Sequence, residues 1–222
     1  IWQDDFNGAA LNPKCWAPLK DQLYNNQYEL QNFTPRPENV QVADGMLKII
    51  ARKERNDARG RVVDYTSAQI SSQYLAAWTY GRFESRIKFP QGNGLWPVFW
   101  LYPDKKDYGF HPRSGEIDIA EAIMREPRRL TAVIHYGGFG KRQKHTVQFA
   151  ALDHTEELWR DFHVYAAEWR PNSIKFFFNG KQFHEARDWA PPPGAKKGAP
   201  FDRPFHFFLT LAIGGDWAGK PD

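Results

Sequence analysis

The chain has 222 residues, of which 41% are hydrophobic and 16% aromatic, which suffices for one sizeable core in a single all-β domain. Its net charge of +4 comes without a block of Lys or Arg, which excludes a nucleic-acid-binding arm, and no apolar run approaches the roughly 18 residues of a membrane span. Cys15 is the single cysteine, which excludes an intramolecular disulfide and a multi-thiolate metal site.

Short β-rich runs separated by Gly, Pro, Asn and Asp recur along the chain, and long helical periodicity is nearly absent. This pattern predicts an all-β sandwich or barrel. In chain order, strands are expected at residues 47–53, 66–73, 80–89, 95–102, 131–136, 162–170 and 205–213. A short helix is expected at 153–160, and a surface loop at 188–200 inside one domain that spans 1–222.

Two of these segments carry a particular pattern. In residues 80–89, Phe83 and Phe89 fall on the same side of a strand as Ser85 and Ile87, and charged side chains fall on the other, as in a half-buried antiparallel strand. Residues 173–183 have Asn-Gly at their centre, the pair that tolerates positive φ at both positions of a type I′ turn. They predict a β-hairpin.

The stretch GEIDIAEA, residues 115–122, places three carboxylates at uneven spacing. In a strand Glu116 and Asp118 lie on one face, and strict alternation would turn Glu121 to the other. A β-bulge after Asp118 would add one residue and return Glu121 to the shared face, and bulges are common beside active sites. The spacing therefore predicts a bulged strand with three carboxylates on one side.

Such a cluster suits general acid/base and nucleophilic chemistry. Two Glu side chains that lean together approach the roughly 5 to 5.5 Å separation of a retaining glycosidase. Mutual repulsion should raise at least one pKa, which supplies a protonated acid beside an ionised nucleophile. Two alternatives stay open at this point: a solvated polar strand face, and a carboxylate site for Ca²⁺ or Mn²⁺, although the motif contains no His.

Aromatic residues precede the acidic strand. Trp96 and Trp100 share one face of a regular strand, where flat indoles could stack on sugar rings, while a place in the core is expected for one of the two but not for both. His135 is a candidate hydrogen-bond donor to substrate, or a structural strand histidine. The tryptophans expected to serve packing or loops are Trp78, Trp169 and Trp189.

The E-x-D-x-x-E spacing from Glu116 to Glu121 resembles the bulged signature of glycoside hydrolase family 16. Further segments resemble its laminarinase-type members, in order and at plausible spacing: residues 2–8, 78–88, 94–101, 162–169 and 211–217. The resemblance covers nearly the whole chain.

This resemblance implies a β-jelly-roll sandwich of two antiparallel sheets, a concave glycan-binding cleft and a retaining double displacement. Glu116 would be the nucleophile, Glu121 the general acid/base, and Asp118 the group that orients the nucleophile. Substrate contacts are implied for Trp96, Trp100, His135 and Trp217. Catalysis would need no cofactor, while a structural Ca²⁺ ion away from the cleft is possible, with ligands that the sequence does not place.

Several positions depart from the family pattern. Residues 109–112 read Gly-Phe-His-Pro where relatives usually have Gly-Trp-Pro, so His111 replaces a sugar-stacking Trp. The chain stops before the strand that normally completes the sheet, and it opens without a leader, so a signal peptide is expected to be absent or removed. Basic residues bracket the acidic strand and are expected to be solvated loop charges, with anionic sugars as the alternative: Lys105, Lys106, Arg113, Arg125, Arg128, Arg129, Lys141, Arg142 and Lys144.

The expected function is retaining endo-hydrolysis of a β-1,3-glucan such as laminarin. The alternatives are a hydrolase or transglycosylase of β-1,3-1,4-glucan or of agar, porphyran or carrageenan, and a non-catalytic β-glucan-recognition protein. The paired Glu116 and Glu121 argue against the last, since a binding module does not need them. A polysaccharide partner, no nucleic acid, no membrane contact, a monomeric state and secretion are expected with this function.

Overall fold

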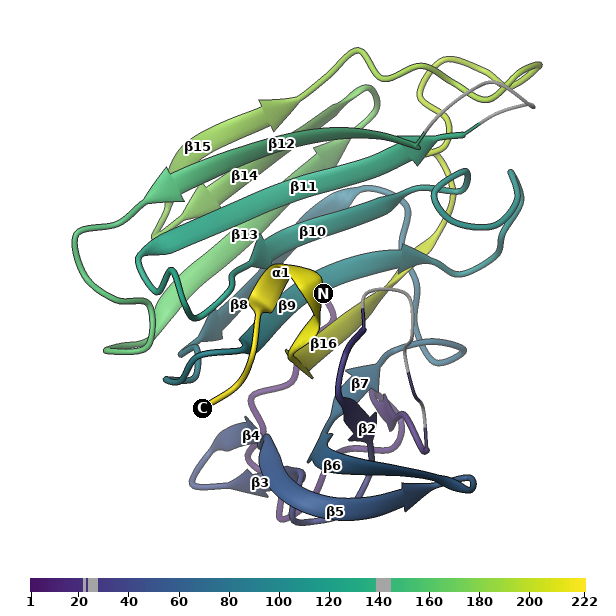
Figure 1. The fold of residues 1–222 in the computed structure, drawn as a ribbon. Coiled ribbons are helices and arrows are strands. Elements are labelled where there is room, and N and C mark those ends of the chain that lie inside the picture. Colours follow the sequence, from purple (N-terminus) through teal and green to yellow (C-terminus); the bar gives the residue numbers. More distant parts are fainter. Residues whose placement is uncertain (22, 24–27, 139–144) are drawn as a thin grey trace.

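The computed structural model describes residues 1–21, 23, 28–138 and 145–222 (Figure 1). Its largest sheet is antiparallel and seven-stranded, and it curves across the middle of the molecule (Figure 1). In spatial order its strands are β1 (Ala17–Pro18), β7 (Gln69–Ser71), β16 (Phe205–Ile213), β9 (Leu95–Pro103), β10 (Glu116–Glu121), β11 (Arg129–Gly137) and β12 (His145–Asp153).

A four-stranded antiparallel sheet packs behind it. Its strands in spatial order are β15 (Lys181–Ala186), β14 (Ser173–Phe178), β13 (His163–Arg170) and β8 (Gly81–Ile87). Large apolar side chains fill the space between the two sheets, among them the fully buried Ile117, Leu101, Tyr165, Trp169 and Phe176. The expected sandwich of two antiparallel sheets is confirmed, and packing roles are found for Trp169, for the buried Trp189 and for Trp78 at the core margin.

Two small sheets extend the molecule below the sandwich (Figure 1). One contains β2 (Gln31–Phe33), β6 (Arg61–Ser67) and β5 (Arg52–Ala58), and β2 pairs with β6 in parallel; the other is the hairpin of β3 (Val40–Ala43) and β4 (Met46–Ile49). A single-turn helix, α1 (Gly215–Ala218), follows β16. Among the described residues, no helix has the length and apolar character needed to cross a membrane.

The two patterned segments fold as predicted. Phe83 and Phe89 are buried while Arg82, Glu84 and Arg86 on the opposite face are exposed. β14 and β15 form the hairpin, and its turn residues Asn179 and Gly180 have φ values of 48° and 79°, as a type I′ turn requires.

Other expectations on secondary structure are wrong. The helix at 153–160 does not form, because Asp153 ends β12 and the following residues form turns. β12 itself was not predicted, since its mixed polar and apolar residues lie on an exposed edge strand. Residues 47–53 and 66–73 each divide between two strands, so two single strands become β4 with β5 and β6 with β7.

Candidate active site

The predicted bulge is present in β10. Asp118 pairs with Trp100 on β9 and with Val133 on β11, while Glu121 pairs with Val98 and Thr131, so three steps along β10 match two on each neighbour. One residue is therefore extra on β10. It returns Glu121 to the face that carries Glu116 and Asp118, while Ile117 and Ile119 enter the core on the other side.

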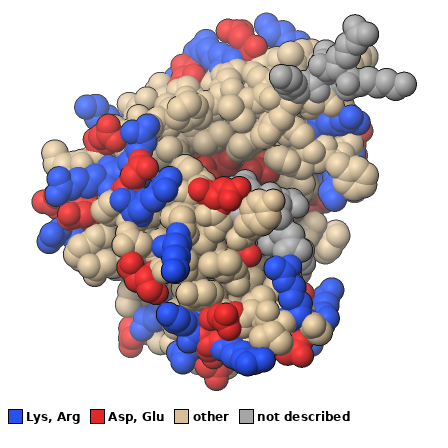
Figure 2. Space-filling model, in the orientation of Figure 1, with Lys and Arg blue, Asp and Glu red and all other residues tan. Residues whose placement is uncertain are grey.

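The shared face of β10 is the floor of an open groove. Figure 2 shows acidic side chains inside a hollow in the middle of this face. The Asp118 side chain is 3% exposed and that of Glu116 17%, and Glu121 as a residue is 9% exposed. Three carboxyl groups thus meet where little water reaches them.

Burial changes the proton affinity of all three carboxyls. Desolvation first, and the neighbouring Asp118 charge second, raise the pKa of Glu121 from 4.5 to about 8. Desolvation and the adjacent Asp118 carboxylate also raise the pKa of Glu116, and desolvation raises that of Asp118. The cluster therefore holds protons near neutral pH, as general acid chemistry requires.

Trp96 and Thr131 hold Glu121 from both sides. The Trp96 indole N–H donates to Glu121 Oε1 at 2.9 Å, and the Thr131 hydroxyl donates to the Glu121 backbone carbonyl at 2.9 Å. Trp96 is 8% exposed and packs edge-on against Trp217 with ring centroids 5.2 Å apart. Its buried ring positions a carboxyl group and offers little face to a sugar.

Histidines approach the other two carboxyls. His135 Nε2 lies 3.1 Å from Asp118 Oδ2 and 3.8 Å from Glu116 Oε1, and His111 Nε2 lies 3.3 Å from Glu116 Oε2. Asp118 Oδ2 has no hydrogen bond within the described part of the chain, so the His135 contact is a close approach without hydrogen-bond alignment. Partial desolvation and repulsion from His135 and His145 lower the pKa of His111.

The remaining sequence candidates also line the concave face. Trp100 stacks on Phe208, with centroids 4.6 Å apart, and its N–H donates to Thr210 Oγ1 at 2.9 Å. Trp217 lies at a groove of about 340 Å³ that also involves Glu121. Trp96, Trp100, His111, His135 and Trp217 therefore all lie at or next to the three carboxylates.

Residues that the sequence reasoning missed come mainly from β12. Phe149 and Val147 point onto the concave face and are 59% and 45% exposed, and Phe149 lines the same groove as Trp217. His145 begins the strand, with its Nε2 2.8 Å from His135 Nδ1. The alternation of Val147, Phe149 and Ala151 was the available signal for this strand.

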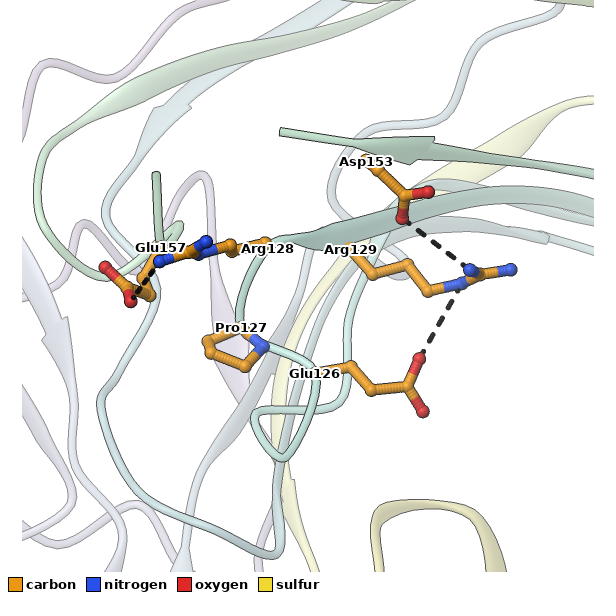
Figure 3. Close-up of a pocket in the computed structure, with 6 residues that line it drawn as sticks. All are labelled: Glu126, Pro127, Arg128, Arg129, Asp153 and Glu157. Atoms are coloured by element: carbon orange, nitrogen blue, oxygen red, sulfur yellow. Dashed lines mark hydrogen bonds and ion pairs between the residues drawn. The ribbon is translucent and has the colours of Figure 1, made fainter. Parts of the chain in front are cut away.

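A neighbouring depression of about 360 Å³ lies at the far end of β11 and β12 (Figure 3). Its charges are already paired: Arg129 contacts both Asp153, at 3.6 Å, and Glu126, at 3.7 Å, and Arg128 contacts Glu157 at 3.2 Å. The two arginines of this depression are therefore each paired with at least one carboxylate.

The other basic residues on either side of the acidic strand contact different kinds of partner. Arg113 donates to the Gly138 carbonyl at 2.7 Å, Arg125 lies 3.9 Å from Glu126, and Lys106 lies over the Phe110 ring. Lys141, Arg142 and Lys144 lie outside the described residues. All six described residues of this basic set are exposed, as expected of solvated loop charges: Lys105, Lys106, Arg113, Arg125, Arg128 and Arg129.

Metal-ligating side chains gather only in the cleft within the ranges that the structure describes. One group is Glu116, Asp118 and His135, and the other is His111, His135 and His145. Neither is the all-oxygen set that Ca²⁺ prefers, and neither lies away from the cleft. The structural Ca²⁺ ion remains a prediction of the sequence, since backbone and amide oxygens can also hold such an ion.

Neighbouring carboxyl groups on the floor of an open groove, one of them with a raised pKa that lets it donate a proton, are the arrangement with which glycoside hydrolases cleave a glycosidic bond. The model of Glycosyl hydrolases family 16 matches residues 27–222, and the chain belongs to this family. Its sandwich is the jelly roll of that family.

The chain is also similar to individual proteins that cleave glycans. The chain is 35% identical over 229 residues to a beta-glucanase of Rhodothermus marinus, covering 99% of this chain and 77% of the relative. It is 33% identical to the glucan endo-1,3-beta-glucosidase A1 of Niallia circulans, covering 99% of this chain but only about a third, 34%, of that protein. A solved structure from work on endo-acting O-glycanases, with which human gut microbiota initiate mucin breakdown, matches with a TM-score of 0.89 at 28% identity over 99% of this chain and 82% of that chain.

Proposed function

We propose that the protein is a retaining endo-glycosidase that hydrolyses β-1,3-linked glucan by double displacement. The observation that carries this proposal is the bulge that brings Glu116, Asp118 and Glu121 to one buried face. A protein that only recognised glucan would not need two glutamates beside an aspartate on one face, whereas an acid that donates a proton near neutral pH needs a raised pKa such as that of Glu121. The similarity to two β-glucan-cleaving relatives supports the substrate class.

Each carboxyl has a separate role in the proposed reaction. Glu116 attacks the anomeric carbon as its glycosidic bond breaks, and Glu121 gives its proton to the leaving oxygen. Glu121 then removes a proton from water, which attacks the glycosyl–Glu116 ester and releases the sugar with its original anomeric configuration. The Trp96 N–H keeps the Glu121 carboxyl in place in both steps.

Glu116 must be ionised to act as the nucleophile, although burial raises its pKa. We assign the shared proton of the Glu116–Asp118 pair to Asp118, because its side chain is 3% exposed against 17% for Glu116. His111 and His135 approach Glu116 at 3.3 and 3.8 Å and favour its charged form whenever either ring is protonated. By holding the shared proton, Asp118 leaves Glu116 ionised and able to act as the nucleophile.

A second substrate class is favoured by one observation. His111 stands beside Glu116 where the family pattern has a Trp, so hydrogen-bonding rings surround part of the groove in place of one flat apolar platform. Such a surface offers a glycan more hydrogen-bonding groups than an indole would, and the structural match to work on endo-acting O-glycanases also supports a substrate other than glucan. Agar, porphyran, carrageenan and mucin glycans are therefore alternative substrates.

The substrate is identified by a reducing-sugar assay on laminarin, lichenan, agarose, porphyran, carrageenan and mucin. Fastest release from laminarin supports the β-1,3-glucanase, and release only from a galactan or mucin establishes the second class. Because such polymers do not enter cells intact, we also propose that the protein acts outside the cell. We further propose that it acts as a monomer.

Replacing Glu116 tests the assignment of the nucleophile. We expect Glu116→Gln to lower kcat at least about a thousandfold, because the amide cannot form the glycosyl ester. Glycan binding, measured by calorimetry, should remain. Glu84→Gln, on the exposed face of β8, is the matched control and should keep full activity. Turnover that survives in Glu116→Gln would refute the mechanism, and proton NMR showing initial release of the inverted anomer would refute retention.

A further inference from the structure

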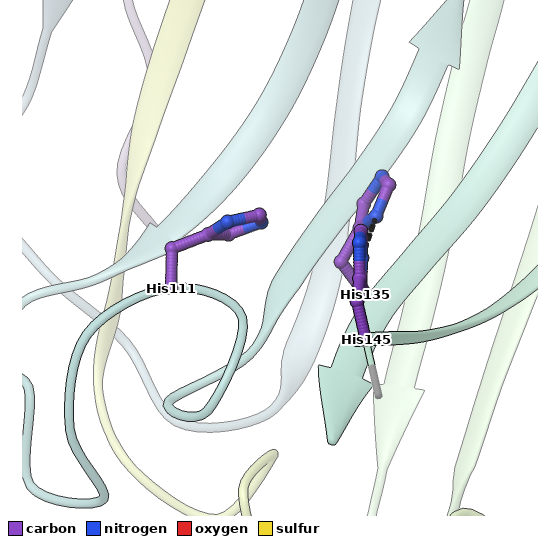
Figure 4. Close-up of side chains that lie close together, drawn as sticks. All are labelled: His111, His135 and His145. Carbon is purple, nitrogen blue, oxygen red and sulfur yellow. Dashed lines mark hydrogen bonds between the residues drawn. The ribbon is translucent and has the colours of Figure 1, made fainter. Parts of the chain in front are cut away.

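Three histidines from three different segments lie close together beside Glu116 (Figure 4). His111 comes from the loop between β9 and β10, His135 from β11 and His145 from the start of β12. Their ring centroids lie 4.9 to 5.8 Å apart, and one nitrogen of each ring lies within 4.8 Å of the others.

The strand register explains how two of the rings meet. On the concave face His135 pairs with Val147, and His145 pairs with Gly137, so the two histidines are diagonal neighbours. Gly137 has no side chain, so the His145 ring can lean across it toward His135. The result is the 2.8 Å approach of His135 Nδ1 and His145 Nε2.

We propose that His111, His135 and His145 form a binding site for one divalent transition-metal ion of the Zn²⁺ type, and that the bound ion blocks the nucleophile Glu116. Three imidazoles are the ligand set of an open tetrahedral Zn²⁺ site, which leaves a fourth position for water or a carboxylate. His111 and His145 are exposed, so their rings can adjust to nitrogen separations of about 3.4 Å, which Zn–N bonds of about 2.0 to 2.1 Å require.

A second, independent observation is the Asp118 carboxyl group behind His135, which can accept a hydrogen bond in either protonation state. Histidines that bind a metal through one nitrogen almost always donate their other N–H to a carboxylate or carbonyl, which fixes the tautomer. Asp118 Oδ2 is buried, has no hydrogen bond within the described residues, and lies 3.1 Å from His135 Nε2. A metal on Nδ1 would place the remaining proton on Nε2, facing that orphaned oxygen.

The donor atoms also decide which ions bind. Imidazole nitrogens suit Zn²⁺, Co²⁺, Ni²⁺ and Cu²⁺, whereas Mg²⁺ and Ca²⁺ prefer oxygen. Excess Ca²⁺ should therefore not compete. The fourth position lies beside Glu116, whose Oε2 is 3.3 Å from His111 Nε2, so the ion would engage that carboxylate and keep substrate from it.

Metal binding is tested on the full chain without reference to its activity. We expect calorimetric titration with ZnCl₂, in the presence of excess CaCl₂, to show one ion bound per chain, and Co²⁺ to give the visible absorption of a tetrahedral site. His145→Ala should weaken binding at least about a hundredfold, since loss of an outer-shell partner alone costs 10 to 100-fold. His154→Ala, which removes a histidine outside the cluster, is the matched control and should bind as the unaltered protein does.

Two further variants test Zn²⁺ binding, so that the result does not depend on the folding of His145→Ala alone. His111→Ala should weaken Zn²⁺ binding as His145→Ala does, and Asp118→Asn should weaken it by about 10 to 100-fold. Zn²⁺ should also inhibit glycan cleavage by the unaltered protein, and a chelator should restore it. The inference is overturned if no ion binds, or if Zn²⁺ affinity is the same in His145→Ala and His111→Ala as in the unaltered protein. Cleavage that Zn²⁺ saturation leaves unchanged would overturn the blocking of Glu116.

Discussion

Trp96 lies on the expected strand and has a hydrogen-bond partner that the sequence did not indicate. Its indole, for which both sugar stacking and a place in the core were considered, is 8% exposed and donates to Glu121 Oε1. A hydrogen bond to a carboxylate favours the ionised form and so lowers its pKa. We therefore propose Trp96 as a positioning and tuning residue.

This role predicts a change in the pH profile. Glu121 must be protonated to act as the acid, so kcat/KM falls as the pH rises through its pKa of about 8. Trp96→Phe removes the donor and raises that pKa, so the basic limb should move up by about one pH unit or less. Trp100→Phe, whose N–H donates to Thr210, should leave the limb in place. A basic limb unmoved in Trp96→Phe would exclude the tuning role.

At the residue scale, the sequence predicted the three carboxylates and the neighbours of β9 and β11, because motif spacing and strand alternation act over a few residues. It missed His145 and Phe149. Both belong to β12, and their importance depends on register with β11, a contact between strands that no local pattern encodes.

The loop that enters β10 depends on a glycine. Gly115 has φ of 88°, and a Cβ atom there would lie 2.8 Å from Phe201 and 3.1 Å from Phe205 in the core. Only a residue without a side chain fits, and it sets the direction of the next residue, Glu116. The glycine thus connects core packing to the placement of the nucleophile.

Substitution of Gly115 separates crowding from backbone strain. Gly115→Ala should lower the free energy of unfolding by about 2 kcal/mol or more, from the positive φ together with the clash. Gly180→Ala has φ of 79° and open space around its Cβ, so it should cost about 1 kcal/mol. Chemical denaturation measures both. Equal losses in the two variants would show that contact with Phe201 is unimportant.

At the element scale, the bulge could be predicted from the uneven spacing of the three carboxylates, since one extra residue after Asp118 is needed to bring all three to the same face of the strand. The divisions of 47–53 and 66–73 could not, because strand ends there depend on which sheet each half joins. The incorrect helix at 153–160 illustrates the same limit, since pairing with β11 extends β12 to Asp153 and overrides the local capping pattern.

For the whole molecule, the buried Glu121 and His206 change the stability of the fold in opposite directions as the pH rises. The native state keeps a proton on Glu121 up to about pH 8, whereas the unfolded chain releases it near 4.5. The unfolded state is therefore favoured as pH rises between these values. His206 is fully buried with its pKa lowered from 6.5 to about 4, so it favours the unfolded state as pH falls between those two values.

Glu121→Gln isolates the contribution of Glu121 to the pH dependence of stability. The contribution of His206 is the same in both proteins and cancels in the difference between them. The free energy of unfolding of the variant minus that of the unaltered protein should increase as the pH rises from 5 to 8, by at most about 1.4 kcal/mol per pH unit. Above pH 8 this difference should be constant. Urea denaturation at several pH values measures it. A difference independent of pH would contradict a protonated, buried Glu121.

β16 lies between β7 and β9 in the large sheet, although its residues 205–213 follow β9 by about a hundred positions. Chains emerge from the ribosome N-terminus first, so β9 and β10 are synthesised well before the strand that completes their sheet. Until β16 inserts, the half of the sheet that bears the carboxylates is not joined to the β7 half. Nascent chains of this protein should therefore be inactive and have an exposed β9 edge, a natural target for chaperones, until synthesis has passed Ile213.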